Sequence, residues 1–460
     1  MIQGLSDYYR VPESLFGRVL GSDLSSDVGF FRFGPNAICY GRCASGVSAR
    51  IESSLLYDAS LSVRLNETEI HLPFDPAQVI KNLRHEQYME GLVPGRERLV
   101  TQEWIRKAYY LVRTLLPVSV RRHLQRAYFS DWQSRPFPAW PVDFTVDILH
   151  EEFLRLSMYA AGVQRVPFVW FWPDGAPNCL IMTHDVETRA GRDFTSQLMD
   201  LDESYGIKAS FQVIPENRYD VPDEYVQEIR KRGFEFNIHD LNHDGRLYQK
   251  REEFLRRAKK INAYTHQYKA TGFRAGAMYH VLDWYDAYEF SYDMSLTNVA
   301  HLEPRPGGCC TVFPFFIGRI LELPLTTAQD YSVFHILNDY SIGLWKKQLN
   351  LIRQRNGLMS FITHPDYLIN NRARKVYEML LDYLGQMVNR EKIWAALPGE
   401  VDHWWRARSQ MKLVQKGSGW EVEGPEAERA RIAFAVVEGD RLVYEVAGAR
   451  AQKDYILNVP

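Results

Sequence analysis

The feature of this sequence that most constrains its fold is an alternation of short apolar runs with longer helical patterns, from residue 175 to about residue 400. Such alternation is typical of repeated βα units around a parallel sheet. Seven or eight repeats fit a closed barrel better than an open sheet, and active sites of such barrels lie at the carboxyl ends of the strands. The predicted strands are residues 179–183, 209–214, 234–239, 271–275, 292–296, 321–325, 358–363 and 392–396.

Three regions are predicted along the 460 residues, which are enough for two or three domains. Residues 1–170 are predicted to form an α+β region. It contains a hairpin around Asn66, with strands 61–65 and 69–72, and a helix capped by Asp75. Residues 171–400 form the predicted α/β barrel, a catalytic domain. Residues 401–460 form a small β-rich module, with hairpin turns at 417–419 and 438–440.

Two features outside the strand pattern have alternative interpretations. Further helices are expected near residues 101–116 and 118–128. Their arginines are interpreted as a solvated helix face, with a phosphate-binding patch as the alternative (Arg113, Arg121, Arg122 and Arg126). The aromatic run just before the barrel is interpreted as interdomain packing, with stacking on sugar rings as the alternative (Trp170, Phe171 and Trp172).

Charge and composition limit the partners and the compartment. The 57 acidic and 55 basic residues nearly cancel, so net charge favours neither nucleic acid nor an anionic membrane as a partner. No signal peptide and no apolar stretch long enough for a transmembrane helix are evident. The five cysteines are interpreted as reduced thiols, although Cys39 and Cys43 have the spacing of half a metal site. We therefore expect a cytoplasmic protein with no integral membrane segment, of undetermined oligomeric state.

Two short polar runs, each at the end of a predicted strand, carry the chemistry of this sequence. In the run 183–187, Asp185 and Glu187 are two residues apart, so their carboxylates share one side of an extended backbone. In the run 239–243, His239 and His243 can face one point where the backbone turns helical. One carboxylate and two imidazoles commonly bind a catalytic zinc, and the second carboxylate can then act as a base on water. The leading hypothesis is a metal-dependent hydrolase.

The other histidines are interpreted as structural. The run 239–243 also resembles the zincin motif, but a strand precedes it and Asp240 stands where a zincin has glutamate, which argues against that reading. His184 is expected to point to the face opposite Asp185 and to pack. The remaining histidines without a partner pattern are His266, His280 and His301.

The barrel region resembles a known family through four motifs in a fixed order. They are the runs 183–187 and 239–243, Gly272-Phe273-Arg274, and residues 361–365, in which His364 closes the last apolar strand. Together they are similar to the polysaccharide deacetylase superfamily, the chitooligosaccharide-deacetylase homology domain of carbohydrate esterase family 4. The resemblance implies a distorted (β/α) barrel of seven to eight strands and says nothing of the flanking regions.

The resemblance also implies a role for each motif residue. Glu187, His239 and His243 would hold zinc or a similar divalent metal, which activates water and polarises the amide. Asp185 would take the proton, with Arg274 orienting it. The catalytic acid that protonates the departing amine would be His364. A backbone N–H after Arg274 would help the metal stabilise the oxyanion. The implied activity is de-N-acetylation of an N-acetylated sugar or polysaccharide intermediate.

Departures from the family pattern leave alternatives open. Glu187 lies one residue later than in the commonest form, so the base and the ligand could be exchanged. The usual Pro and aromatic after Arg274 are missing, and only Asp330 is a candidate for the acid that tunes His364. Two other functions remain: an amidohydrolase acting on a non-sugar C–N bond, and a catalytically idle scaffold in polysaccharide biosynthesis. Without a signal peptide, an intracellular carbohydrate precursor is the favoured substrate.

Overall fold

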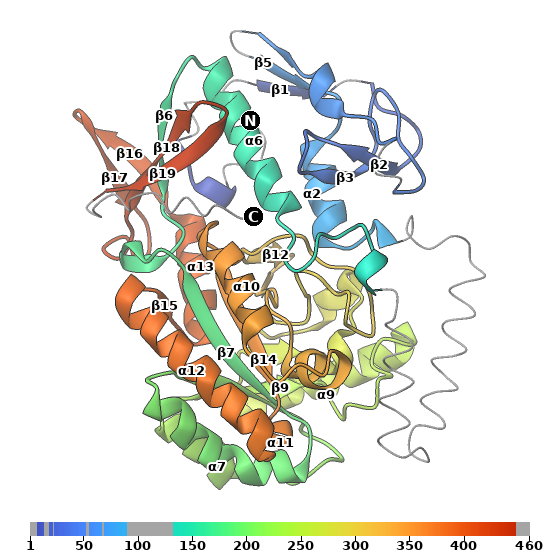
Figure 1. The fold of residues 1–460 in the computed structure, drawn as a ribbon, viewed down its shortest axis with the longest axis vertical. Helices are drawn as coiled ribbons and strands as arrows, with labels where there is room; N and C mark the ends of the chain where they lie inside the picture. The colour runs from blue at the N-terminus through green and yellow to red at the C-terminus, as the bar shows by residue number, and fades with distance from the viewer. Residues whose placement is uncertain are drawn as a thin grey trace.

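The computed structural model describes residues 7–12, 18–21, 23–51, 55–66, 69–89 and 132–447 (Figure 1). The helices predicted near 101–116 and 118–128, with their arginine series, lie outside these residues. Among the residues that are described, no helix is both long enough and apolar enough to cross a bilayer.

The largest sheet is the one that the βα alternation predicts. All its pairs are parallel except β12 with β13. The strands between β13 and β14 are buried on both faces, whereas β12 and β15 each have an exposed residue. Each of the eight predicted runs overlaps one of its strands, so the distorted α/β barrel is confirmed; the antiparallel β12 was not predicted. In spatial order the strands are β12 (Phe315–Ile317), β13 (Ile320–Glu322), β11 (Tyr292–Asp293), β10 (Gly272–Arg274), β9 (Glu235–His239), β8 (Ala209–Val213), β7 (Cys179–Val186) and β14 (Leu358–Thr363), with β15 (Trp394–Ala395) beside the start of β7.

Threonine side chains connect the barrel where the main-chain ladder is interrupted, between β13 and β14. The Thr326 hydroxyl donates to the Leu358 carbonyl at 2.8 Å, and the Thr327 hydroxyl donates to the Ser360 carbonyl at 2.7 Å. The N–H of Ser360 donates back to the Thr326 hydroxyl at 2.9 Å. The segment after β13 therefore lies against β14 through side-chain hydrogen bonds, which distorts the barrel here.

Amphipathic helices surround the strands (Figure 1). The longest of them, α12, begins at the cap Asn370, whose side chain accepts from two backbone N–H groups, and it turns a stripe of apolar residues towards the sheet. The helices of this layer are α7 (Arg189–Ser204), α8 (Asp223–Lys231), α9 (Arg251–Tyr268), α10 (Gly343–Arg353), the short α11 (Pro365–Leu368), α12 (Asn371–Glu391) and α13 (Pro398–Gln410).

The N-terminal region confirms most of its local predictions. The predicted hairpin is β4 (Arg64–Leu65) with β5 (Glu69–Leu72), and β1 (Arg18–Gly21) adds to it; β2 (Gly29–Arg32) pairs with β3 (Ile38–Gly41). The first predicted strand is shorter than expected, because Ala59–Ser62 form a 3-10 helix capped by Asp58. Asp75 caps α2 (Pro76–Arg84) as predicted. A longer helix, α6 (Thr145–Ala160), leads towards the barrel.

The C-terminal hairpins are joined to a strand that precedes the barrel. The predicted turns connect β16 (Lys412–Lys416) with β17 (Gly419–Glu423), and β18 (Ile432–Glu438) with β19 (Arg441–Val446). β18 also pairs with β6 (Arg165–Val169), which the three-region division assigns to the N-terminal part. That division stays a prediction. The aromatic run after β6 is buried, and its indole N–H groups donate to the Ala176 and Asn356 carbonyls, so it packs and does not stack on a ligand (Trp170, Phe171 and Trp172).

Candidate active site

The first site residues lie where β7 ends. Asp185 is the next-to-last residue of this buried strand, and Glu187 follows its last residue. The extended backbone places both side chains on one side, as the spacing predicts. His184, the residue before Asp185, points to the other face. There it forms hydrogen bonds with Thr363 at 2.7 Å and with Asp202 at 2.9 Å. His184 is thus a buried packing residue, as expected.

The two histidines of the second motif converge without a helix. His239 is the last residue of β9, and the loop after it contains two residues with left-handed backbone, Asp240 (φ 56°) and His243 (φ 53°). Arg218 fixes this loop, because its guanidinium donates to the His243 carbonyl at 2.7 Å. The imidazole ring centroids are 4.9 Å apart. A zincin motif needs a continuous helix, so that alternative is excluded here.

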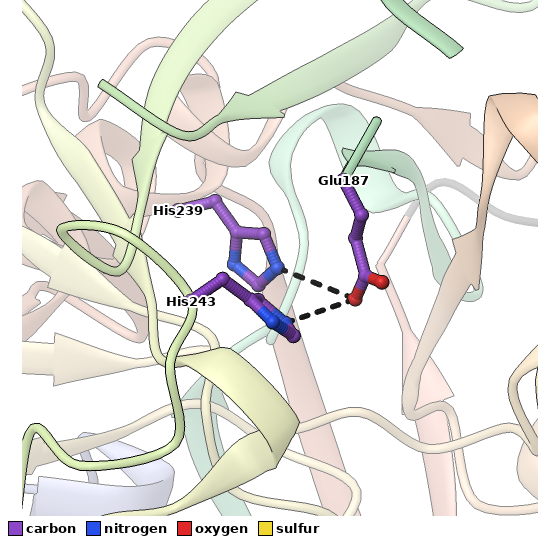
Figure 2. Close-up of side chains that lie close together, drawn as sticks. All are labelled: Glu187, His239 and His243. Atoms are coloured by element: carbon purple, nitrogen blue, oxygen red, sulfur yellow. Dashed lines mark ion pairs between the residues drawn. The ribbon is translucent and has the colours of Figure 1, made fainter. Parts of the chain in front are cut away.

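Glu187, His239 and His243 form one group of converging ligand atoms. One atom from each of the three lies within 4.8 Å of the others, and this is the one such group of three or more among the described residues. Figure 2 shows the Glu187 carboxylate facing both imidazoles. Glu187 Oε1 lies 2.9 Å from His243 Nε2 and 3.8 Å from His239 Nε2. Asp185 does not belong to this group, which favours Glu187 as the ligand and Asp185 as the base.

The hydrogen-bonding state of the imidazoles fits a cation. His239 Nδ1 lies 3.1 Å from the Arg274 carbonyl, to which it donates, so its Nε2 carries the lone pair that faces Glu187. The Nε2 atoms of both His239 and His243 are buried; that of His239 makes no hydrogen bond, and that of His243 makes none of regular geometry but faces Glu187 Oε1 as an ion pair at 2.9 Å. An electron pair that faces a carboxylate oxygen is stabilised only by a proton or a cation between them. The donor set of one carboxylate and two imidazoles therefore fits a divalent metal of the zinc type.

Electrostatics keep the two site carboxylates ionised. Burial raises the pKa of Asp185, but the Arg274 guanidinium and the imidazoles of His239 and His364 lower it by more, so it lies below its ordinary value. The pKa of Glu187 lies well below its usual range, because the nearby imidazoles, His243 first, outweigh its burial. Burial lowers the pKa of His243 but Glu187 raises it by more, so the net shift is upwards. Both carboxylates are thus ready to bind a cation or to accept a proton.

Arg274 fixes Asp185 from the neighbouring wall of the barrel. The guanidinium of Arg274 is fully buried at the end of β10, and its Nη1 donates to Asp185 Oδ1 at 2.6 Å. The same nitrogen donates to the Thr183 hydroxyl at 2.8 Å, and Nε donates to the Met294 carbonyl at 3.0 Å. Because Arg274 donates to Oδ1 of Asp185, the other carboxylate oxygen, Oδ2, faces the site. It lies 3.8 Å from His239 Nε2. Thr183 belongs to the run 183–187, but the sequence does not indicate its contact with Arg274.

His364 lies directly after β14, the strand that pairs with β7, and Asp330 holds it. Asp330 accepts from the backbone N–H of His364 and from its Nδ1, each at 2.7 Å. This leaves Nε2 facing Glu187 Oε1 at 3.6 Å. Burial lowers the pKa of His364, but Asp330 and Glu187 raise it well above its ordinary value. The sequence made Asp330 only a weak candidate; the side-by-side course of β14 and the segment after β13 is what brings the two residues together.

The loop after Arg274 forms a wall of the metal group. A Cβ on Gly276 would lie 2.5 Å from Asp240 Oδ2 and 3.0 Å from His243 Cδ2, so only glycine allows this close approach. The N–H of Ala275 donates to the Ser295 hydroxyl at 2.8 Å and is not available to a ligand. The predicted oxyanion donor of this loop stays a prediction.

Two of the other histidines have partners that the sequence did not indicate. His266 lies at the surface, where its Nε2 is 2.5 Å from Glu289. His280 is buried and forms an ion pair with Glu86 at 2.9 Å. His301 is buried beside the ring of Trp140. All five cysteines are free thiols in buried positions.

Comparisons with known proteins give structural likenesses alone. No family model and no curated protein matches the chain. It is similar in structure to a candidate polysaccharide deacetylase from Mycobacterium smegmatis, with a TM-score of 0.42 and 16% identity, over 55% of this chain and 98% of that one. A peptidoglycan deacetylase from Bacillus subtilis gives a TM-score of 0.33 at 12% identity, over 50% and 93% of the two chains. A chitin deacetylase from Colletotrichum lindemuthianum gives 0.33 at 13%, over 50% and 89%. Since each TM-score is below 0.5, the fold assignment rests on the strand order described above.

Proposed function

We propose that this chain is a metal-dependent hydrolase that removes the acetyl group from an N-acetylated sugar. The observation that carries the proposal is the convergence of Glu187, His239 and His243 on one point. His239 Nε2 is buried without a hydrogen-bond partner, and His243 Nε2 is buried against the Glu187 carboxylate at 2.9 Å. A structural cluster would satisfy these atoms internally, because an unpaired buried polar group costs about 1–3 kcal/mol. Asp185 and His364 stand beside this group, each fixed by its own partner.

A divalent metal held by Glu187, His239 and His243 would lower the pKa of its water and polarise the scissile carbonyl. Asp185 accepts the proton of the attacking water at Oδ2, since Oδ1 is occupied by Arg274. Arg274 also keeps Asp185 ionised in its buried position, so that the base is present without a preceding ionisation step.

His364 then protonates the departing amine. Asp330 fixes the ring through Nδ1, so the proton of Nε2 points into the site. The raised pKa of His364 keeps that proton in place near neutral pH, where an amine leaving group needs it. Base and acid lie at the ends of two neighbouring strands, β7 and β14, beside the metal group, so both can reach the same amide.

The finer assignments are part of the proposal. We take zinc as the metal, a lipid-linked, nucleotide-linked or surface-polysaccharide intermediate as the substrate, and the cytoplasm as the compartment. A carbohydrate is the expected partner, and residues 171–400 the catalytic unit.

The test combines elemental analysis with release of acetate from a panel of N-acetylated sugars. We expect about one zinc per wild-type chain and acetate release that a chelator abolishes and added zinc restores. Zinc binding together with cleavage of non-sugar amides alone would favour the amidohydrolase. Zinc binding or sugar binding without any hydrolysis would favour the idle scaffold. Absence of stoichiometric metal in every preparation would rule out the proposed site.

A further inference from the structure

Outside the metal group, one carboxylate of the N-terminal region is buried against the barrel. Glu86 follows the end of α2, in left-handed backbone (φ 55°), and only 3% of its surface is exposed. Its Oε2 lies 2.9 Å from His280 Nε2 and 3.5 Å from Arg305 Nε. Burial raises the pKa of Glu86, but His280 and Arg305 lower it by more, so the net shift is downwards. The proposed mechanism does not use this ion-pair network.

The barrel is shaped to receive this carboxylate. Gly307 and Gly308 have φ values of 137° and 146°, which favour glycine. A Cβ on Gly307 would lie 3.0 Å from the carboxyl carbon of Glu86, so any side chain there would press against it. Nearby, the hydroxyl of Tyr88 donates to the Gly308 carbonyl at 2.6 Å. The segment after α2 therefore packs against residues 307–308 of the barrel through Glu86 and Tyr88.

His280 transmits this contact to the loop that follows Arg274. Its Nδ1 lies 3.0 Å from the Met278 carbonyl while its Nε2 faces Glu86, so both ring nitrogens face acceptors. An imidazole can donate from both nitrogens only when it is protonated, which makes the pair with Glu86 an ion pair. Arg305, which also contacts Glu86, donates to the His280 carbonyl. His280, the last residue of this loop, is thus held both by its side chain and by its backbone carbonyl.

The near end of the same loop touches the metal group. Gly276 packs on Asp240 and on the ring of His243. Between the two ends, Met278 packs with Leu325 and with Ile362, which precedes His364 by two residues. Residues 275–280 therefore lie between Glu86 on one side and the histidines of the site on the other.

We propose that Glu86 is a positioning residue for the active site: through His280 it holds the loop 275–280 against His243, so that the N-terminal region completes the wall of the metal group. The consequence for chemistry rests on the proposed function, but the consequence for the loop does not. This gives a role to a part of the chain for which the sequence indicated none.

The test uses the full chain with Glu86→Ala and Glu86→Gln. Glu152→Gln is the control, because within the described part of the chain the ion pair of Glu152 is with Arg155 of its own helix, at 2.6 Å. Hydrogen–deuterium exchange of residues 275–280 is measured in metal-free protein, and zinc affinity by competition with a chelator. In Glu86→Ala we expect exchange of this segment to rise at least about tenfold while β14 keeps its protection, because an uncompensated buried charge opens the loop locally. Zinc affinity should fall about tenfold to a hundredfold, as for lost outer-sphere support.

Glu86→Gln should lie between Glu86→Ala and the wild type, since its amide oxygen still accepts a hydrogen bond from His280. Glu152→Gln should match the wild type, and Glu86→Ala combined with His280→Ala should add little to Glu86→Ala alone. Wild-type exchange of residues 275–280 in Glu86→Ala would overturn the inference, and so would a uniform loss of protection across the barrel. If wild-type protein binds no zinc, the proposed function fails, while the exchange data still decide the role of Glu86.

Discussion

The same strand, β9, contributes to two buried polar clusters at opposite ends of the barrel, and the two differ in one respect. At its start, Asn237 donates to the Ser210 and Tyr292 hydroxyls and accepts from the N–H of Gly272. Glu235 beside it accepts from Tyr292 and from the N–H of Gly399. At the other end, the Nε2 atom of His239 makes no hydrogen bond, and that of His243 faces the Glu187 carboxylate.

The difference separates a structural cluster from a ligand site. Buried polar groups are hydrogen-bonded in nearly all cases, so a satisfied network needs nothing from outside. At the carboxyl end Arg274, Thr183 and Asp330 fix the side chains of the site from outside. The Nε2 atom of His239 is nevertheless left without a hydrogen-bond partner, and that of His243 faces only the Glu187 carboxylate among the described residues. The chain thus holds these side chains in place, as the proposed metal site requires.

The largest effect is expected from removing a metal ligand. His239→Ala or His243→Ala should lower bound zinc well below one per chain, with the barrel still folded by circular dichroism. Activity should fall by about 10³-fold or more, since a metal contributes several kcal/mol of transition-state stabilisation. Full zinc occupancy in both variants by elemental analysis would falsify the site assignment and make the unsatisfied cluster a structural one.

Asp185→Asn should separate binding from catalysis within this cluster. The amide keeps the shape of the side chain but cannot accept the proton, so kcat should fall by about 10²–10⁴-fold. Zinc content should stay at the wild-type level, because Asp185 is not among the converging ligand atoms. If zinc is lost from Asp185→Asn and retained by Glu187→Gln, the two carboxylates have exchanged roles.

His364→Ala should show an effect that depends on the leaving group. Cleavage of an N-acetyl amide should slow by about 10²-fold or more, because the amine departs unprotonated. An activated acetyl ester, whose leaving group needs little protonation, should be cleaved at close to the wild-type rate. Equal losses on the two substrates would contradict the role as acid and leave His364 a structural or substrate-binding residue.

The smallest effect on activity is expected from the satisfied cluster. Tyr292→Phe removes a buried hydroxyl that Asn237 and Glu235 use, so the free energy of unfolding should fall by about 1–3 kcal/mol. Zinc content and kcat should stay unchanged when measured below the melting transition. A variant of normal stability that has lost zinc would show that the two ends of β9 do not differ as described.

The motif residues converge in the structure because they follow strand ends, where chain order and spatial order agree. Asp185 and Glu187 share a side through the strand period of two, and parallel neighbours bring Arg274 and His239 to the same edge. The partners of these residues were harder to predict. Asp330 meets His364 across the interruption between β13 and β14, which no local pattern marks. Glu86 and His280 are separated by 194 residues, and each alone resembles an ordinary polar residue of a loop.

For the fold, too, the sequence predicted the elements marked by a local pattern and missed those that depend on distant partners. Alternation of apolar runs predicted every parallel strand of the large sheet, because most of these strands are buried on both faces and form apolar runs. The parallel β1 of the N-terminal region was not predicted. The alternation also missed β12, whose three residues include the exposed Phe316, so that no buried run marks the strand. It also placed β6 in the N-terminal region, because the choice of β18 as its neighbour depends on how the whole barrel is closed.

The pairing of β6 with β18 has a consequence for synthesis of the chain on the ribosome. β6 is made before the first barrel strand, whereas β18 emerges only after the last barrel helix. Until then the edge that β18 covers has no main-chain partner, and exposed strand edges promote association with other chains. The hydroxyl contact of Tyr9 with Tyr444, at 2.6 Å, waits for the same late segment. A nascent chain therefore carries an unpaired β-edge throughout elongation of the barrel. During this interval the edge of β6 is a site where chaperone binding would prevent association.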